Sequence, residues 1–429
     1  MSNLLQDLEK REQDRNPIAV AVVGAGQMGR GLVASLGHIP GMTPALVVDK
    51  DVELAENALI SAGIPQHSIE RASDPESASR LLSKGFHIVS SDTHIIPPNG
   101  IEAVVEATGV PEVGAKVALD AIRRRQHIVL LNVETDVTIG PFLKQMADQA
   151  RVIYSVSAGD EPGATVELVE FARTLGFKVI AAGKGKNNDL IPEATPDTVR
   201  REATEKGASP HMFCSFVDGT KTMVEMTAVA NATGLIPEIP GMRGLHLTID
   251  ELCTTLVPKS WGGVLDHTGV VEFVHGVAPG VFVVITSDNK VIRDDLRYLK
   301  VGPGPAWTLF RPYHLANLET PHTVAKAVLY GEKCLAPGDK PVAETVGVAK
   351  TDLSVGDHID GIGGYMVRGL IMTANSAQEQ HAVPLGLLQN AVLKRPIAQN
   401  EIIRHEDVEL SSSSLIVTLR RLQDHWLAS

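Results

Sequence analysis

The sequence contains few cysteines, few aromatic residues and no long apolar run. Its three cysteines, Cys214, Cys253 and Cys334, are odd in number and form no C-x-x-C pair, which argues against a disulfide framework or a cysteine zinc site. No run of about 18 apolar residues occurs, so we expect no membrane span. The first segment is charged and lacks the apolar core of a secretory signal, so we expect a cytoplasmic protein.

Positive charge is also scarce. The chain has 39 Lys and Arg against 51 Asp and Glu, a formal net charge of −12. This balance disfavours nucleic acid as a partner, because phosphate binding requires clustered basic residues. A small anionic substrate remains compatible, since a local basic pocket can lie on an acidic protein. With 429 residues of ordinary globular composition, the chain is expected to form two or three domains.

The clearest motif lies near the start of the chain. An apolar run, IAVAVV, predicts a buried parallel strand, and GAGQMG follows it directly, before a helical pattern. Gly24 allows the sharp turn from strand to helix, and Gly26 allows a pyrophosphate to approach the backbone closely. Gly29 allows the helix to pack closely on the strand. Gln27 and Met28 open the helix, whose dipole favours the pyrophosphate. The motif therefore predicts binding of NAD(H) or NADP(H).

The nucleotide preference stays open at this level. A second strand ends at Asp49, twenty residues after Gly29, where a carboxylate would accept hydrogen bonds from the adenosine ribose and favour NAD. Lys50 follows directly and would instead suit the 2′-phosphate of NADP. Both residues are candidate cofactor ligands.

Strands and helices continue to alternate up to about residue 155. This pattern predicts an α/β fold with a doubly wound parallel sheet, including a helix over 139–149. Ligands bind at the carboxyl ends of the strands in such sheets. Three residues at predicted strand ends are therefore added to the cofactor site: Thr108, Gly109 and Asn132.

The middle of the chain holds the candidate substrate site. The segment SVSAGDEPG follows a strand and places Asp160 and Glu161 on the ligand-facing side. A strand over 178–182 is expected to run into a loop, GKGKNN, on which Lys184, Lys186 and Asn187 form a cradle for an anion. The alternative is a solvated lysine loop.

A helix is predicted over 220–234, with Asp218 as its N-cap. Lys221 and Glu225 are four residues apart and share a face. They either form a surface pair or point into a pocket, where Lys221 would donate a proton to a carbonyl oxygen. Asp218 and Glu225 would alternatively hold a divalent metal.

Later segments predict a second, α+β domain. Strands over 270–274 and 281–285 are expected to pair with each other, and a strand over 307–314 precedes a helix over 315–330. Arg311 is a candidate substrate ligand. His314, at the strand-to-helix junction, is a candidate catalytic residue. Short strands and turns after residue 340 indicate a small β-rich module.

These features together resemble known families. The GAGQMG unit and the order of the later segments resemble homoserine dehydrogenase-like oxidoreductases. The stretch AKTDLSVGDHID with PLGLLQNAVLKRPIAQNEIIRHEDVEL resembles a SAF (β-clip) domain, a module also found in sialic acid synthases. The combination, from Pro17 to about Leu410, resembles SAF-containing oxidoreductases that include the 1-deoxy-D-xylulose 5-phosphate reductoisomerase-like enzymes of isoprenoid biosynthesis. One departure is that no lysine follows directly after Asn132, where homoserine dehydrogenases place one.

The resemblance implies three domains and a reaction. It implies an N-terminal extension over 1–16, a Rossmann domain over 17–155, a substrate domain over 156–335 with a helix that returns to the Rossmann unit, a SAF-like domain and tail over 340–429, and a homodimer. It implies isomeroreduction to 2-C-methyl-D-erythritol 4-phosphate with NADPH and Mg²⁺ or Mn²⁺. Lys184, Lys186 and Asn187 would then suit the phosphate. The implied metal ligands are Asp160, Asp218 and Glu225. The alternatives are a semialdehyde or sugar-acid dehydrogenase of the homoserine dehydrogenase type and a non-catalytic dinucleotide-sensing regulatory protein.

Overall fold

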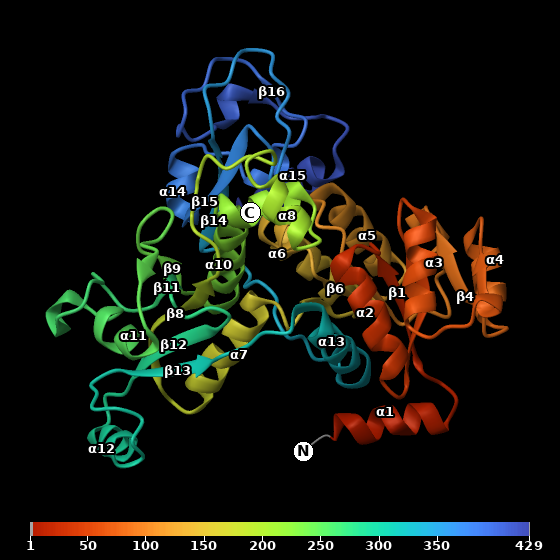
Figure 1. Cartoon of the computed structure of the whole chain (residues 1–429), viewed down its shortest axis with the longest axis horizontal. Helices are drawn as coiled ribbons and strands as arrows, with labels where there is room; N and C mark the ends of the chain where they lie inside the picture. The colour runs from red at the N-terminus through yellow and green to blue at the C-terminus, as the bar shows by residue number, and fades with distance from the viewer. Residues whose placement is uncertain (1–2, 429) are drawn as a thin grey trace. The chain divides into compact units, whose positions relative to one another are not determined.

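The structure is a computed structural model that describes residues 3–428. The chain divides into two compact units. Within the described residues, the first comprises 3–160 and 315–336, and the second comprises 161–314 and 337–428. Figure 1 shows both, with α13 (Ala316–Tyr330) as the late segment that belongs to the first unit. No helix among residues 3–428 is both long enough and apolar enough to cross a membrane.

The first unit is built on a seven-stranded sheet of order β3-β4-β2-β1-β5-β6-β7. Every pair in it is parallel, which confirms the predicted doubly wound α/β fold. Its strands are β1 (Ile18–Val23), β2 (Met42–Val48), β3 (Ile69–Arg71), β4 (His87–Ser90), β5 (Ala103–Glu106), β6 (His127–Leu130) and β7 (Tyr154–Val156). Its helices besides α13 are α1 (Leu4–Gln13), α2 (Gln27–His38), α3 (Val52–Ser61), α4 (Pro75–Leu82), α5 (Pro111–Arg123) and α6 (Val133–Ala150).

Helix α6 corrects one prediction. It begins at Val133, six residues before the predicted start at 139. The side chain of Asn132 caps it by accepting a hydrogen bond from the N–H of Thr135, at 3.1 Å. Every residue from Val133 to Pro141 is buried, so this part of the helix has no solvent-exposed face. A helix buried on all sides leaves no periodic signal in the sequence.

The second unit contains a mixed sheet of order β10-β11-β8-β12-β13, with β9 also on β11. Its strands are β8 (Lys178–Lys186), β9 (Ile236–Pro237), β10 (Leu245–His246), β11 (Val270–His275), β12 (Val281–Thr286) and β13 (Trp307–Arg311). The predicted pairing of β11 with β12 is wrong: β8 lies between them, parallel to β11 and antiparallel to β12.

Two glycines within β8, Gly183 and Gly185, allow this strand to lie between its neighbours. An added Cβ on Gly183 would lie 1.6 Å from the carbonyl oxygen of Glu272, and one on Gly185 would lie 2.4 Å from the backbone nitrogen of Ala278. Only glycine allows both neighbouring chain segments to approach this closely. The segment predicted as a lysine loop is therefore strand, and Lys184 and Lys186 are strand residues buried to about 5% and 6% exposure.

Helices α7 and α10 pack on each other and on this sheet. The helices of this part are α7 (Glu161–Thr174), α8 (Arg200–Glu205), α9 (Pro210–Val217), α10 (Thr220–Thr233), α11 (Ile249–Thr255) and α12 (Lys290–Tyr298). Helix α10 confirms the predicted helix almost to the residue. Its N-cap is Gly219 rather than Asp218, although Oδ1 of Asp218 still accepts from the N–H of Thr220, at 2.8 Å.

The C-terminal part of the second unit packs on α10. It consists of β14 (Ala343–Ala349), β15 (Val367–Thr373), α14 (Ala374–Glu379), β16 (Val392–Leu393), β17 (Val408–Glu409) and α15 (Leu415–Ala428). β14 and β15 form an antiparallel pair, as short strands and turns predict. Hydroxyls of Thr227 and Thr345 lie 2.7 Å apart, and the side chain of Asn231 bonds the backbone of Ala343. These buried contacts join β14 to α10.

Candidate functional site

The glycine loop of the first unit has the geometry that a dinucleotide requires. Gly24 has φ +99°, and an added Cβ there would lie 2.9 Å from the backbone of Ala107. At Gly29 an added Cβ would lie 1.8 Å from the carbonyl oxygen of Gly24. An added Cβ on Gly26, by contrast, meets no atom within 4 Å, and Gly26 is the N-cap of α2. The space before the helix N-terminus is therefore open, and the residues present fit a pyrophosphate.

The remaining loop residues surround this helix start. Gln27 and Met28 are exposed in the first turn of α2. Oδ2 of Asp49, at the end of β2, accepts from the N–H of Ala25 at 2.7 Å. Lys50 is exposed directly after it. The carboxylate of Asp49 thus lies against the glycine loop, and its hydrogen bond from Ala25 holds the loop backbone in place.

A buried carboxyl group lies at the end of β5. The side chain of Glu106 is fully buried, and its Oε1 accepts from both the N–H and the hydroxyl of Thr108. Burial raises the pKa of Glu106 to about 7, and the hydrogen bonds from Thr108 and Asn132 lower it by less. Gly109 is exposed, with φ +68°. The predicted residues Thr108 and Asn132 therefore lie around a carboxyl that is partly protonated near neutral pH.

In the second unit, Lys184 forms the centre of a buried charge cluster. Its Nζ lies 2.8 Å from Oε1 of Glu161 on α7 and donates to Oε2 of Glu225 on α10. Burial opposes the charge of Lys184, but the two carboxylates prevail and raise its pKa. Nε2 of His314 lies 3.4 Å from the same Glu161 oxygen. Helices α7 and α10 thus meet at the charged lysine of β8, and His314 joins the cluster through Glu161.

Lys186 lies two residues further along β8 and has different partners. Its Nζ donates to the carbonyl oxygen of Phe216, at 2.6 Å. Burial and the neighbouring Lys184 lower the pKa of Lys186 to about 8. Asn187, just beyond the strand, is exposed and takes no part in the buried cluster.

Two of the three carboxylates predicted as metal ligands are held by lysines. Oδ2 of Asp218 lies 2.7 Å from Nζ of Lys350, and Glu225 pairs with Lys184. A divalent cation at either carboxylate would have to displace an ammonium group. Asp160 is half-buried and directly precedes Glu161 in the chain. Asp218 and Glu225 therefore do not fit a metal site as they stand, and we derive no step through a metal.

Two further residues predicted for this site, Lys221 and Arg311, lie on α10 and at the end of β13. Lys221, in the first turn of α10, is half-buried, and Glu225, one turn further along, is paired with Lys184. Arg311 pairs with Glu167 of α7, at 2.9 Å, and stacks over the ring of Tyr313. These contacts hold Arg311 against α7, and its role as a substrate ligand stays a prediction.

The sequence alone does not identify three charged residues of these sites, of which Glu106 and Lys350 are buried and Glu161 is partly buried. Glu161 was placed on the ligand-facing side but was given no role, although its position directly after Asp160 was the available signal. Glu106 ends an apolar strand, where a carboxylate is unusual. Lys350 donates to the carbonyl oxygens of Ala194 and Gly364, at 2.8 and 2.7 Å. Nothing in its local sequence distinguishes Lys350 from a surface lysine.

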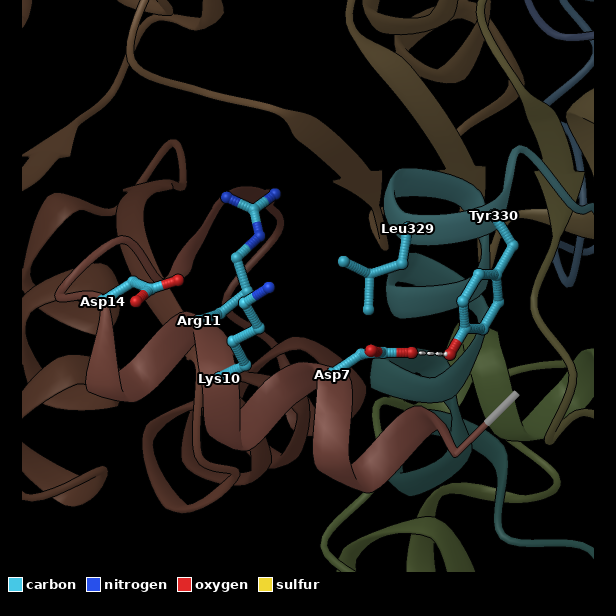
Figure 2. Close-up of a pocket in the computed structure, with 6 residues that line it drawn as sticks. All are labelled: Asp7, Lys10, Arg11, Asp14, Leu329 and Tyr330. Atoms are coloured by element: carbon cyan, nitrogen blue, oxygen red, sulfur yellow. Dashed lines mark hydrogen bonds between the residues drawn. The ribbon is translucent and has the colours of Figure 1, made fainter. Parts of the chain in front are cut away.

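A pocket of about 290 Å³ lies between α1 and α13 of the first unit. Figure 2 shows its lining, with the hydroxyl of Tyr330 donating to Asp7 at 2.6 Å. Arg11 is also occupied, since it pairs with Glu102 at 2.6 Å. The lining contains acidic, basic and apolar side chains, namely Asp7, Lys10, Arg11, Asp14, Leu329 and Tyr330. It contains none of the predicted site residues.

Comparison with known proteins adds one match in sequence. Residues 159–320 match the model of the family described as "Oxidoreductase DRL, catalytic domain". That segment contains Glu161, Lys184, Lys186, Glu225 and His314. No curated protein matches the chain. The match supports an oxidoreductase and covers the whole lysine cluster.

Solved structures that match this chain have low sequence identity to it and low TM-scores. A probable dehydrogenase from Thermotoga maritima is 13% identical, with TM-score 0.40, over 73% of this chain and 90% of that chain. A myo-inositol dehydrogenase from Corynebacterium glutamicum is 11% identical, with TM-score 0.41, over 73% and 89%. A myo-inositol dehydrogenase from Lactobacillus casei, in complex with NAD(H) and myo-inositol, is 14% identical, with TM-score 0.42, over 75% and 89%. Similarity at this level carries no functional argument.

Proposed function

We propose that this chain is an NAD(P)-dependent oxidoreductase that acts on a small, polar, anionic oxo or hydroxy substrate. The observation that carries the proposal is the buried Lys184 cluster, which lies within the segment similar to an oxidoreductase catalytic domain. The open glycine loop at the start of α2 supports a dinucleotide as cofactor. Perturbed, buried titratable groups of this kind are typical of functional sites.

The first unit would hold the cofactor by its backbone. N–H groups at the start of α2 would bind the pyrophosphate, and Asp49 would bind the adenosine ribose. When bound, the nicotinamide supplies or accepts a hydride. The first unit itself does no chemistry beyond binding and orienting the cofactor.

The second unit would supply fixed charge. A lysine ammonium has three N–H donors, and Glu161 and Glu225 accept two of them, which leaves one for a substrate oxygen. The carboxylates also fix the direction of Lys184, so its charge would stabilise negative charge that develops on that oxygen without reorganisation. Lys184 is therefore a binding and electrostatic group in this proposal.

The specific reaction that we propose to test first is isomeroreduction of 1-deoxy-D-xylulose 5-phosphate. The test follows the absorbance of NADPH and of NADH with this substrate, with and without Mg²⁺ or Mn²⁺. Oxidation of the cofactor by the purified protein supports the proposal and identifies the preferred nucleotide. If tight cofactor binding occurs without oxidation, this substrate is rejected, and semialdehydes and sugar acids are tested next. If no substrate in this series is turned over, the chain is instead a dinucleotide-binding regulatory protein.

Two matched variants test the placement of the site. Lys184→Met removes the central charge of the cluster, and we expect turnover to fall at least 100-fold. Lys178→Met is the control, because Lys178 is on the same strand but is exposed and paired with Asp288. If Lys184→Met keeps turnover within a few-fold of the control, the cluster is not the active site.

A further inference from the structure

Lys184 and Lys186 form a buried pair of amines with unequal surroundings. Residues two apart on a strand point to the same face, and these two side chains both reach polar partners on the helical side, Lys184 on α7 and α10 and Lys186 on α9. The intervening Gly185 faces the other side, where the backbone of Ala278 leaves no space for a side chain. The strand thus presents two ammonium groups side by side.

The surroundings of Lys184 keep it protonated. Two carboxylates, Glu161 and Glu225, contact its Nζ, and together they raise its pKa despite burial. A group that is protonated throughout the neutral range binds an oxygen well but gives up its proton poorly. Lys184 therefore suits a fixed charge and not a proton carrier.

Lys186 has the opposite character. Among residues 3–428 no carboxylate lies within 4.0 Å of its Nζ, and its hydrogen bond goes to a neutral acceptor, the carbonyl oxygen of Phe216. The charged and titratable groups around it are Lys184 on the same strand, Glu225 on α10, Asp218 before α10, Asp189 beyond the strand, and His275 on β11. Burial and the positive charge of Lys184 destabilise its ammonium form, whereas the three carboxylates favour it without contact.

We propose that Lys186 is the group that exchanges a proton with the substrate oxygen during hydride transfer. The inference rests on the proposed function. In the reductive direction, a bound nicotinamide would supply the hydride to the carbonyl carbon. The C=O π electrons then move to oxygen, and Lys186 Nζ gives that oxygen a proton. The neutral amine is then reprotonated by water. In the oxidative direction the neutral amine accepts the hydroxyl proton, so one residue serves both directions.

The two directions give opposite pH dependence, which makes the assignment testable. The reductive kcat/KM requires the ammonium form and should fall as pH rises through about 8. The oxidative kcat/KM requires the neutral amine and should rise over the same range. An interaction that is only structural would affect both directions alike.

The experiment measures kcat/KM from pH 6 to 10 in both directions, with the substrate on which the wild type is active. It compares the wild type with Lys186→Met, Lys186→Arg and the exposed control Lys178→Met. We expect both Lys186 variants to lose activity roughly 100-fold or more and to lose the pH-dependent limb near 8. We expect the control to stay within about twofold of the wild type and to keep that limb. Cofactor affinity, measured by fluorescence titration, should not change in any of them.

Each outcome has a distinct meaning. If Lys186→Met or Lys186→Arg keeps the limb near pH 8 and most of its activity, the role of Lys186 is wrong while the proposed oxidoreductase function stands. If Lys186→Met misfolds, the decision rests on Lys186→Arg, which keeps the positive charge and the stem of the side chain. If the wild type turns over none of the tested substrates, the proposed function fails, and the Lys186 assignment fails with it.

Discussion

Lys350 and Asp218 form a buried ion pair, with Nζ of Lys350 2.7 Å from Oδ2 of Asp218. Both side chains are almost fully removed from water. The remaining donors of Lys350 go to the carbonyl oxygens of Ala194 and Gly364, so its ammonium is fully coordinated. Cys214 lies 3.4 Å away, and burial raises the pKa of its thiol to about 11, which keeps the thiol neutral. The pair therefore serves as a structural joint between β14 and the start of α10.

The first prediction concerns this joint. Lys350→Met should destabilise the protein by about 3–5 kcal/mol, because it leaves the carboxylate of Asp218 buried without a counter-charge. Urea denaturation followed by circular dichroism measures the change. The double variant Lys350→Met with Asp218→Asn should lose clearly less than the sum of the two single variants. Additive losses would mean that the two side chains are not coupled.

A second prediction separates two glycines of the cofactor loop. Gly26→Ala should leave stability unchanged, since its Cβ meets no atom within 4 Å, yet should weaken NAD(H) binding about tenfold or more because the methyl group occupies the space of the pyrophosphate. Gly29→Ala should destabilise the fold itself, because its Cβ would lie 1.8 Å from the backbone oxygen of Gly24. Thermal unfolding and cofactor titration of both variants test the contrast. Equal effects of the two substitutions on stability would contradict it.

A third prediction concerns nucleotide preference. Asp49→Ala removes the carboxylate at the end of β2, and the relative affinity for NADPH over NADH should rise by roughly tenfold, about 1.4 kcal/mol. The neighbouring Lys50 is exposed and remains able to meet a 2′-phosphate. Isothermal titration of both nucleotides against wild type and variant gives the ratio. Lys50→Ala should shift the ratio the other way, and an unchanged ratio in both variants would place the adenosine ribose elsewhere.

A fourth prediction follows from the raised pKa of Glu106. Because the folded pKa is about 7 and the ordinary value is 4.5, the contribution of Glu106 to stability is fully present below about pH 4.5 and is lost as pH rises through 7. Glu106→Gln has no charge to bury. Its stability relative to the wild type should therefore improve between pH 5 and pH 8, by roughly 1–3 kcal/mol.

Urea denaturation without cofactor at the two pH values measures this difference. Asp136 and Glu272 are also buried with pKa values raised by burial to about 7, so the absolute stability of the wild type falls over the same range. Only the difference between wild type and variant isolates Glu106. A difference that does not change with pH would mean that the carboxyl is charged throughout.

The amino-acid sequence by itself determined the glycine loop and the parallel sheet of the first unit. The motif GAGQMG and the apolar strand before it act through backbone conformation and close packing, which are local properties that a short segment specifies. The alternation of strands and helices likewise predicted the parallel sheet. Helix α10 was predictable for the same reason, since it is one continuous helical segment between glycines.

The tertiary structure alone decided the partners of the charged residues. The sequence predicts that Lys184 and Lys186 lie in a loop, whereas in the structure they lie on β8, between β11 and β12. The position of β8 depends on the close approach of two backbone segments to Gly183 and Gly185, and these segments are about 90 residues away in the chain. Asp218 and Lys350 lie 132 positions apart in the chain, so no local pattern links them. Whether a lysine titrates near neutral pH depends on its burial and on neighbouring charges. Both of these are set by packing between distant segments, and neither is encoded in residue type or spacing.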